Sequence, residues 1–299
     1  MSSEWSELTR TLVQSALRED LAQAGDITAA LVDAGQTVSA RIVPREAGVI
    51  AGLGLLPTII EVFNDSQGQS VSSASSQIHD GDRVEAGRAA AGLRGSRAGV
   101  LAVERTVLNF LGRMSGVATL TRAYVDAARN VNPDVTVMDT RKTIPGWREL
   151  DKYSVRCGGG TNHRAGLFDA ILIKDNHLAG IPPERLSTTL FEMLNRAGEL
   201  PVKPKFVEVE VDDLGQFEQV CRVLGVDIVL LDNFGIADLR RAVEMRDSLG
   251  LRGRLALEAS GGVMLETIGE IAGSGVDRIS VGALTHSAAA LDIGLDFQV

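Results

Sequence analysis

The spacing of apolar residues changes several times in the N-terminal part of the chain, and each spacing predicts a different element. Residues 6–22 carry leucines at helical spacing, which predicts an amphipathic helix. Residues 37–53 alternate apolar and polar positions before a glycine-rich turn, as strands do, and a further strand is predicted over 89–94. Residues 66–87 are polar and typical of a loop, and a long helical pattern runs from 98 to 130. These elements predict helices packed on a small sheet.

From Asp134 onward, short runs rich in Val, Ile and Leu alternate with helical stretches. Six such runs predict strands over residues 135–139, 170–175, 205–212, 227–233, 254–260 and 278–283. Because most of them are apolar at nearly every position, we expect a parallel sheet with both faces covered. We favour a closed or nearly closed α/β barrel over an open doubly wound sheet, because polar residues gather where the strands end.

The composition is that of a soluble globular protein, with 299 residues, 44% hydrophobic residues and 23% charged residues. The formal net charge of -9 argues against a nucleic-acid or anionic membrane partner, since both would be repelled. No apolar run reaches the roughly 20 residues of a membrane helix, and the N-terminus lacks the pattern of a signal peptide. Cys157 and Cys221 are too few for a disulfide framework or a four-ligand zinc site. We therefore expect a soluble cytoplasmic protein.

Each predicted barrel strand ends in residues that are able to do chemistry. The first four ends carry charged or amide side chains, namely Asp139 to Lys142, Lys174 to Asn176, Glu208 with Glu210, and Asp232 with Asn233. The last two ends carry small residues, namely Ser260 to Gly262, which follow Glu258, and Gly282 with Ala283. Because the active site of an α/β barrel lies at the carboxyl ends of its strands, we expect these residues to face one cavity.

The two ends with small residues predict a phosphate site. Residues 260–262 and 282–283 offer backbone N–H groups, each just before an expected helix, where barrels commonly bind phosphate. Carboxylates beside a phosphate site most simply hold a divalent cation, Mg²⁺, which bridges the protein to a polyphosphate. Glu210 lies nearer its strand end than Glu208 and is our choice of ligand, with Asp232 on the next strand.

A cluster of cations contrasts with the acidic chain and predicts a second anion. Its members are Arg141, Lys142, Arg148, Lys152, Arg156, His163, Arg164 and Lys174. Planar carboxylates suit arginine best, because a guanidinium can donate two parallel hydrogen bonds to them. The sequence therefore indicates two anionic substrates, one phosphorylated and metal-bound and one carrying carboxylates, which is the layout of a transferase.

Simpler interpretations remain for several of these residues. Asp139 and Asp175 are interpreted as helix caps or as partners that orient neighbouring cations, in preference to direct catalysis. Glu208 is assigned to structural support, and Cys157 to a buried free thiol. Three cations spaced by four residues are interpreted as a solvated or ion-paired helix face, namely Arg148, Lys152 and Arg156.

Motifs in the second half of the chain, in this order and spacing, resemble quinolinate phosphoribosyltransferase. They are DTRKTIPG from Asp139, GGGTNHRAGLFDAILIKDNH from Gly158, VEVEVD from Val207, LLDN from Leu230, EASGG from Glu258 and VGALTHS from Val281. The upstream stretches EDLAQAGDITAAL and ERTVLNFLGRMSGVAT are similar to the same family. The resemblance therefore covers nearly the whole chain.

The resemblance implies an α/β fold with two domains and a specific reaction. Residues 1–117 would form an N-terminal α/β sandwich domain on which about 287–299 pack back, and residues 118–286 an incomplete α/β (TIM-like) barrel. The reaction would transfer the phosphoribosyl group from phosphoribosyl pyrophosphate, with Mg²⁺, to quinolinate, a pyridine with two adjacent carboxylates. Decarboxylation would then give nicotinate mononucleotide, pyrophosphate and CO2 in NAD biosynthesis. The family also implies a homodimer, with Arg105 reaching the active site of the neighbouring subunit.

The resemblance further implies a role for each matching residue. The quinolinate carboxylates would be surrounded by Arg141, Lys142, His163, Arg164 and Lys174, and Thr140 would also bind substrate. Glu210 and Asp232 would lie near the ribose and the metal-bound pyrophosphate, and with Lys142 they are the candidate catalytic residues. The phosphate groups would be bound by Ser260, Gly261, Gly262, Gly282 and Ala283. His286 is given only a minor role.

Three alternatives stay open from the sequence. A related phosphoribosyltransferase could act on another heteroaromatic acid such as nicotinate, although the density of cations favours a dicarboxylate. A lyase or aldolase could use Lys174 to form a Schiff base with a carbonyl substrate. A non-enzymatic binding protein would consume no phosphoribosyl pyrophosphate.

Overall fold

The structure is a computed structural model that describes residues 5–32 and 35–298. Contacts divide the chain into two compact units. The first contains the chain up to Arg122, the segment Thr143–Gly159 and the chain from Leu284, and the second contains Ala123–Lys142 and Gly160–Ala283. The sequence analysis placed the boundary between the two domains after residue 117, whereas the first unit continues to Arg122. Residues 1–4, 33–34 and 299, which belong to the expected N-terminal domain and its C-terminal tail, lie outside the described residues.

The first unit is an antiparallel sheet packed against helices. Its elements are α1 (Glu7–Leu21), the 3-10 helix η1 (Ala29–Leu31), β1 (Thr37–Pro44), β2 (Gly48–Val49), α2 (Leu56–Gln67), β3 (Ser72–Ser75), β4 (Arg83–Val84), β5 (Ala91–Ser96), α3 (Arg97–Arg129), which continues into the second unit, α4 (Arg148–Cys157) and β12 (Ile293–Phe297). Four strands form the main sheet in the order β12-β1-β5-β3, and β2 pairs with β4. The serine-rich stretch expected to be a loop therefore contains two strands.

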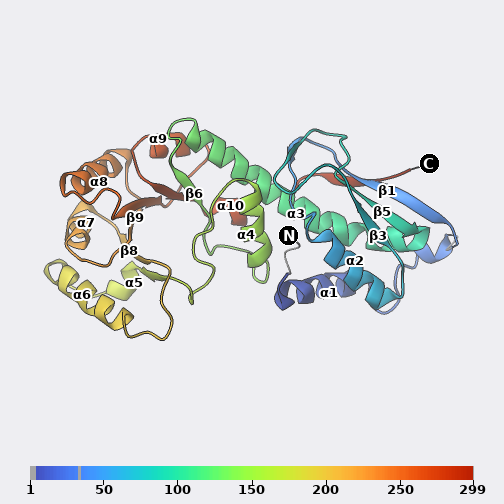
Figure 1. The fold of residues 1–299 in the computed structure, drawn as a ribbon, viewed down its shortest axis with the longest axis horizontal. Helices are drawn as coiled ribbons and strands as arrows, with labels where there is room; N and C mark the ends of the chain where they lie inside the picture. The colour runs from blue at the N-terminus through green and yellow to red at the C-terminus, as the bar shows by residue number, and fades with distance from the viewer. Residues whose placement is uncertain (1–4, 33–34, 299) are drawn as a thin grey trace. The chain divides into compact units, whose positions relative to one another are not determined.

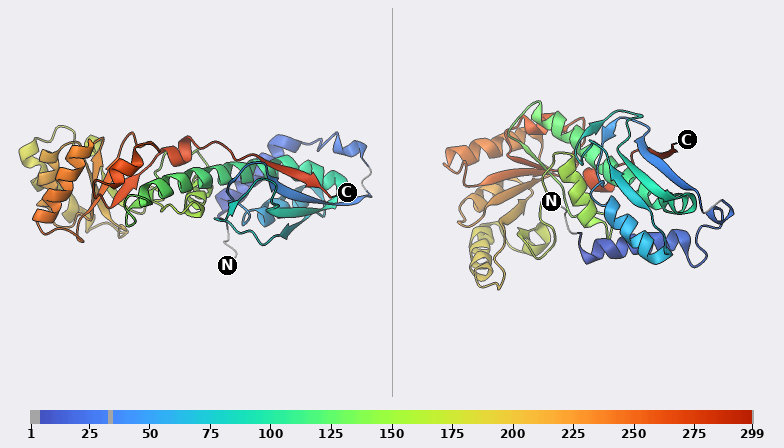
Figure 2. Two further views of the ribbon diagram at one scale, coloured as in Figure 1. Left: turned by 90° about the horizontal axis from the view of Figure 1, so that it is seen from above. Right: turned by 45° about the vertical axis from the view of Figure 1, so that its right-hand side comes forward.

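The core of the first unit lies between this sheet and α1, α2 and α3. Helix α1 begins at the predicted place because the Ser6 side chain accepts a hydrogen bond from the Thr9 N–H, which caps the helix. Its stripe of Val13, Leu17 and Leu21 is buried. Strand β12, at the C-terminal end of the described chain, pairs antiparallel with β1, as Figure 2 shows.

Helix α4 belongs to the first unit, whereas the sequence analysis placed its residues in the barrel. The Tyr153 hydroxyl donates to Asp80 over 2.6 Å, and Asp151 forms an ion pair with Arg113. The side chain of Lys152 is buried, which excludes the solvated interpretation of this helix face at that position and leaves the ion-paired one. These contacts join segments far apart in the sequence, which the helical spacing alone cannot reveal.

Glycines on α3 allow a close approach of the C-terminal segment within the first unit. The Leu291 N–H donates to the Gly112 carbonyl over 2.9 Å, and a Cβ on Gly116 would overlap with the carbonyl oxygen of Ala289. We expect Gly116→Ala to lower the free energy of unfolding by about 1–3 kcal/mol, as overpacked sites do. Denaturant unfolding measures this change.

The control for this prediction is Gly235→Ala, because a Cβ there meets no atom within 4 Å and the backbone φ is -71°. It should change the free energy by less than about 1 kcal/mol, the usual range at a helix start. Equal effects of the two variants would contradict the close approach at Gly116.

The second unit is an incomplete α/β barrel of parallel strands, as expected. Its elements are β6 (Thr136–Met138), β7 (Ile171–Ile173), α5 (Asp175–Leu178), the 3-10 helix η2 (Pro183–Arg185), α6 (Leu186–Ala197), β8 (Val207–Val211), α7 (Leu214–Cys221), β9 (Ile228–Asp232), α8 (Ile236–Ser248), β10 (Ala256–Ser260), α9 (Ile268–Ala272), β11 (Arg278–Ser280) and α10 (Ala283–His286), which ends in the first unit. The strands are arranged in the order β6-β11-β10-β9-β8-β7. Strands β7 to β11 therefore lie side by side in chain order, β6 pairs with β11, and β6 and β7 are the two edges. All six predicted strands are present.

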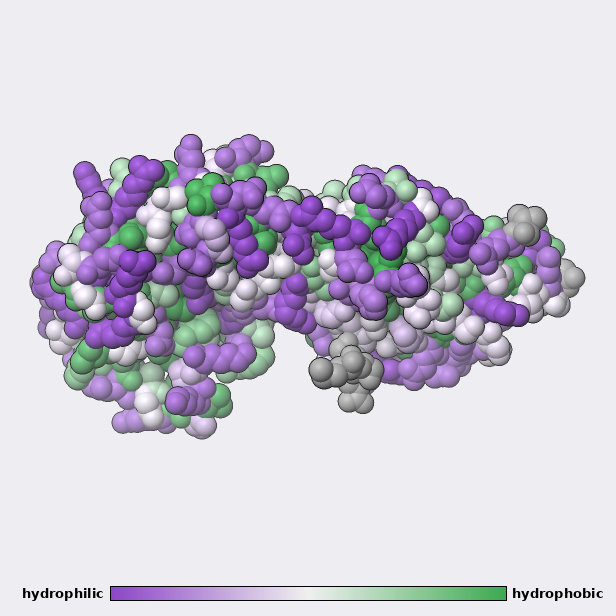
Figure 3. Space-filling view, turned by 45° about the horizontal axis from the view of Figure 1, so that its top comes forward, coloured by the Kyte–Doolittle hydropathy of each residue, from purple (hydrophilic) through white to green (hydrophobic). Residues whose placement is uncertain are grey.

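Helices α6, α7 and α8 lie outside the curved sheet of the second unit, as Figure 1 shows. Strand β8, in the interior of this sheet, is buried at every position. On the face seen in Figure 3, hydrophilic side chains are spread among small apolar areas. Among residues 5–32 and 35–298, no helix is both long and apolar enough to cross a membrane.

Candidate active site

A pocket of about 550 Å³ opens within the second unit and brings together most of the predicted site residues. Eleven of the fourteen line it, namely Thr140, Arg141, Lys142, His163, Arg164, Lys174, Glu210, Asp232, Ser260, Gly261 and Gly262. Gly282 and Ala283 follow β11 but are not among the residues that line it. Arg105 lies on α3 in the first unit, where its side chain is exposed.

Two arginines meet at the cationic side of the pocket. Arg164 is buried, and both its burial and the positive charge of Arg141 lower the pKa of its guanidinium. The Nε atom of Arg141 is shielded from solvent and has no hydrogen-bond partner in the described part of the chain. A bound anion would remove the repulsion between the two guanidinium groups and accept this unused hydrogen bond.

The two predicted metal ligands lie on neighbouring strands. Glu210 of β8 aligns with Leu230 of β9, and Asp232 is two residues further along β9, so both carboxylates face the pocket. One oxygen of Glu210 accepts a hydrogen bond from the Nζ of Lys174, and one oxygen of Asp232 accepts from the Asn233 amide over 2.8 Å. Because Lys174 is paired with Glu210, a carbonyl substrate would have to displace this carboxylate to reach the amine, which argues against Schiff-base chemistry.

A glycine turn after β10 forms the opposite side of the pocket. Gly261 has a φ of +91°, and a Cβ there would overlap with the Asn233 amide, so only glycine fits. Gly262 also has a positive φ, at +58°. The sequence analysis expected a helix directly after this turn, but α9 begins only at Ile268. The backbone N–H groups of the turn, rather than a helix N-terminus, are therefore what this side offers to a phosphate.

Asp139 acts as a partner of the neighbouring segment and does not cap a helix. Its carboxylate accepts the His163 N–H over 2.8 Å and the Asn162 side-chain amide over 2.7 Å. These bonds fix the turn that carries Arg164 into the pocket, which agrees with the orienting role inferred from the sequence. Asp175, at the first position of α5, accepts the Asn176 N–H over 2.7 Å.

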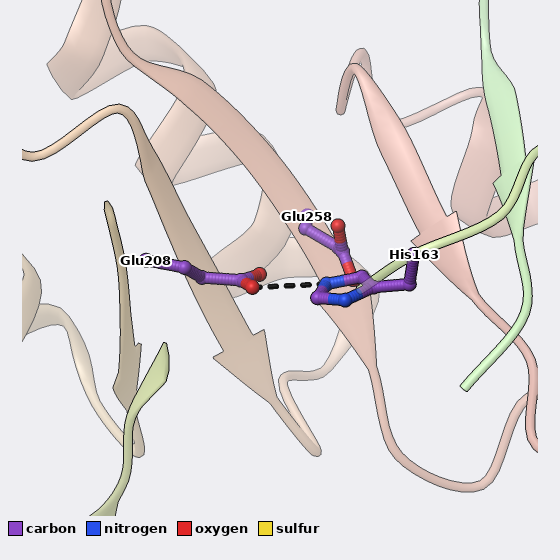
Figure 4. A group of neighbouring side chains, drawn as sticks. All are labelled: His163, Glu208 and Glu258. Carbon is purple, nitrogen blue, oxygen red and sulfur yellow. Dashed lines mark ion pairs between the residues drawn. The ribbon is translucent and has the colours of Figure 1, made fainter. Parts of the chain in front are cut away.

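His163 lies between two buried glutamates, as Figure 4 shows. Its Nε2 atom is 2.9 Å from Glu208 and 3.4 Å from Glu258. Burial lowers the pKa of His163, whereas the hydrogen bonds and charges of the two carboxylates raise it. The Nδ1 atom accepts the Arg164 N–H over 2.8 Å, and this bond opposes a second ring proton because it needs the lone pair.

Six lining residues are not among the fourteen, and three of these six, Leu172, Leu230 and Ser280, were not expected to face the cavity. Leu172 and Leu230 stand two positions before Lys174 and Asp232 in the same strands, so alternation places them on the same face. That spacing was the signal available in the sequence. Apolar strand residues were assigned to the core instead, and these two form the apolar part of the pocket wall.

The cysteines form no disulfide in the described residues. Cys157 is half-buried rather than fully buried, and burial together with the nearby Asp80 carboxylate raises the pKa of its thiol to about 12. This thiol is therefore protonated near neutral pH, which agrees with the assignment of Cys157 as an unreactive thiol.

Comparisons with known proteins give the same family along the chain. The family described as "Quinolinate phosphoribosyl transferase, C-terminal domain" matches residues 117–296, and the one described as "Quinolinate phosphoribosyl transferase, N-terminal domain" matches residues 26–115. The nicotinate-nucleotide pyrophosphorylase [carboxylating] of Mycobacterium leprae is 42% identical over 97% of each chain. Quinolinate phosphoribosyltransferase [decarboxylating] 1b of Nicotiana tabacum is 36% identical, over 95% of this chain and 81% of the relative.

Solved structures agree with the fold. The nicotinate-nucleotide pyrophosphorylase of Francisella tularensis has a TM-score of 0.82 at 37% identity and covers 97% of this chain and 96% of its own. The enzyme of the same name from Ehrlichia chaffeensis has a TM-score of 0.83 at 34% identity, with 99% and 100% covered. The chain belongs to the quinolinate phosphoribosyltransferase family.

Proposed function

We propose that this protein transfers the phosphoribosyl group of phosphoribosyl pyrophosphate to quinolinate, with decarboxylation to nicotinate mononucleotide. The observation that carries the proposal is the pair Arg141 and Arg164, whose like charges face one pocket, where burial and the charge of Arg141 lower the pKa of Arg164 despite the carboxylates of Glu208 and Asp169. A dicarboxylate supplies two negative charges at short spacing, which two guanidinium groups can clamp. The family relation gives the reaction class in which such an acid is the acceptor.

The pocket wall suits a flat heteroaromatic acid. Leu172 and Leu230 offer apolar surface to the ring, while Lys142 and Lys174 add positive charge beside the two arginines. The ring nitrogen must stay unprotonated to act as a nucleophile. Holding both carboxylates from the cationic side would leave this nitrogen directed toward Glu210 and Asp232, where the sugar would lie.

We also propose that Mg²⁺ binds at Glu210 and Asp232, directly or through water. Each carboxylate has a second oxygen that accepts no hydrogen bond from the described residues, so the donor set fits a hard cation that keeps several of its waters. When bound, the ion would neutralise charge on the departing pyrophosphate. The Ser260 to Gly262 turn would bind a phosphate group through its backbone N–H groups.

The reaction would proceed by substitution at the anomeric carbon followed by loss of CO2. The ring nitrogen forms a bond to that carbon as its bond to the pyrophosphate oxygen breaks, and Glu210 or Asp232 stabilises the positive charge that develops on the sugar. The carboxylate next to the now cationic nitrogen then leaves as CO2, and a proton takes its place on the ring carbon. Lys142, Arg141 and Arg164 hold the acid in place during both steps.

We further propose a cytoplasmic homodimer in which Arg105 reaches the site of the neighbouring subunit. An exposed arginine on α3, far in sequence from the other site residues, fits a residue that acts on another chain. The free thiols of Cys157 and Cys221 fit a reducing compartment.

A pyrophosphate-release assay with quinolinate tests the proposed function. We expect release of pyrophosphate and CO2 in equal amounts, and at least about tenfold slower turnover after removal of divalent cations with EDTA, with recovery on addition of Mg²⁺. Nicotinate, which has a single carboxylate, serves as the matched control and should be a far poorer substrate because one of the two clamps has no partner.

Two outcomes would contradict the proposal. Pyrophosphate release with nicotinate at the rate found with quinolinate would assign the protein to another acid. Consumption of neither acid by the folded, Mg²⁺-supplied protein would exclude the transfer reaction.

A further inference from the structure

Two buried glutamates of the barrel hold the same imidazole ring. The side chains of Glu208 on β8 and Glu258 on β10 are 0% exposed, and the His163 ring lies between them, as Figure 4 shows. The His163 side chain is 7% exposed and lines the pocket together with Glu258. Glu208 does not line the pocket, so it acts on a bound substrate through its neighbours, by its contact with His163 and by its charge near Arg164.

The ring has a defined orientation because both nitrogens have partners. Nδ1 accepts the backbone N–H of Arg164 over 2.8 Å, which requires an unprotonated nitrogen at that position. The ring proton therefore lies on Nε2, which is 2.9 Å from a carboxylate oxygen of Glu208. Rotating the ring by half a turn would replace both contacts with carbon atoms.

Glu258 is already held by other partners, whereas the oxygens of Glu208 have no other hydrogen-bond partner among the described residues, so Glu208 is the carboxylate available to the ring. Ser280 donates its hydroxyl to Oε1 of Glu258, and the Nε atom of Arg278 is 2.8 Å from Oε2. Its distance to Nε2 of His163 is the longer one, at 3.4 Å. The group His163, Glu208 and Glu258 could in principle hold a metal ion, since the ligand atoms lie within 4.8 Å of one another. The cation and the hydroxyl on Glu258 occupy the oxygens that a metal would need.

The ring in turn fixes Arg164. Its backbone N–H is tied to the ring, and the N–H of His163 itself is tied to Asp139. The Arg164 guanidinium reaches the pocket next to Arg141 despite the repulsion between their two positive charges. Small shifts at this turn would therefore move the group that clamps a carboxylate.

We propose that Glu208 is a positioning residue, which holds His163 in the Nε2–H tautomer and thereby places Arg164 for the acid substrate. The proposal deepens the proposed function and rests on it for the identity of the acid. The proposal requires that the Glu208 side chain accept a hydrogen bond from Nε2–H of His163, and it does not require the negative charge of Glu208.

Two substitutions separate these properties. Glu208→Met removes the acceptor while keeping a similar volume, and we expect a KM for quinolinate that is about tenfold to a hundredfold higher, with the KM for phosphoribosyl pyrophosphate unchanged within about threefold. Glu208→Gln keeps an oxygen that accepts from Nε2–H and should restore the KM for quinolinate to near the wild-type value. Glu244→Met, on the exposed side of α8, is the matched control and should change neither constant.

Nitrogen-15 NMR of the histidine side chains reads the tautomer without any substrate. The chain has four histidines, and comparison with a His163→Asn variant assigns the signal. We expect an unprotonated Nδ1 and a protonated Nε2 for His163 in the wild type and in Glu208→Gln, and a different state in Glu208→Met. Circular dichroism and thermal unfolding establish that each variant is folded.

Four results would overturn the proposal. One is a wild-type ring protonated on Nδ1, and another is a Glu208→Gln variant as impaired as Glu208→Met. The third is a KM for phosphoribosyl pyrophosphate that rises as much as that for quinolinate in Glu208→Met, and the fourth is a His163 signal that shifts with added Zn²⁺ and returns with EDTA. If quinolinate is not a substrate at all, the proposed function fails, whereas the NMR result still decides whether Glu208 sets the tautomer.

Discussion

Alanine in place of Arg141 is expected to lower kcat/KM for quinolinate by about 30- to 1000-fold, which corresponds to about 2–4 kcal/mol of lost stabilisation. The reason is that one carboxylate of the bound acid would lose its guanidinium partner inside the pocket. The shielded Nε of Arg141, which has no partner within the described residues, is the donor that this carboxylate would use. Steady-state kinetics with quinolinate as the varied substrate measures the effect.

The fold should be unaffected or slightly more stable in this variant, because the charge of Arg141 opposes that of Arg164 in the free protein. Thermal unfolding should therefore give a midpoint equal to or above that of the wild type. Arg240→Ala removes an exposed arginine from α8 and is the control, with kinetics expected to stay at the wild-type level. A kcat/KM near the wild-type value in Arg141→Ala would show that the carboxylate pocket is misplaced.

The second large effect concerns two inactive variants that are expected to restore activity when mixed. If Arg105 acts in the neighbouring subunit, Arg105→Ala and Lys142→Ala homodimers each lack one essential cation at both sites. In a hybrid dimer, one site carries both defects and the other carries none. Random exchange makes about half of the dimers hybrid, so the mixture should reach about a quarter of the wild-type activity.

The exchange itself has to be verified, for example by native mass spectrometry of chains that differ in mass. Self-mixing of each variant is the control and should remain inactive. Absence of rescue in a mixture with demonstrated hybrid dimers would show that Arg105 and Lys142 act within one chain or that Arg105 has no part in the site.

The barrel strands could be read from the sequence because their physical signal is local. A parallel strand covered on both faces, such as Ile228–Asp232, is a short apolar run, and the polar residue at its end marks the mouth of the barrel. The candidate site followed from the same rule, and eleven of its residues line one pocket. Alternation within a strand would have added Leu172 and Leu230.

Features that depend on contacts between distant segments could not be read in this way. Strand Ser72–Ser75 has almost no apolar residues, and it is a strand because its backbone pairs with β5 at the sheet edge. Helix α4 has a clear helical pattern, but its assignment to the first unit depends on contacts of Asp151 and Tyr153 with residues far away in the sequence. Helix α9 begins at Ile268 and not directly after Gly262, because the backbone first forms a loop whose length the residue types do not indicate.

The pairing of β12 with β1 has a consequence for synthesis of the protein on the ribosome. Ala40 aligns with Phe297, so the sheet of the first unit needs residues that are translated after the second unit. The edge of β1 therefore stays open while the second unit emerges, and it closes only after β12 has left the ribosome. Until β12 pairs with it, the unpaired edge of β1 can form hydrogen bonds with strands of other chains.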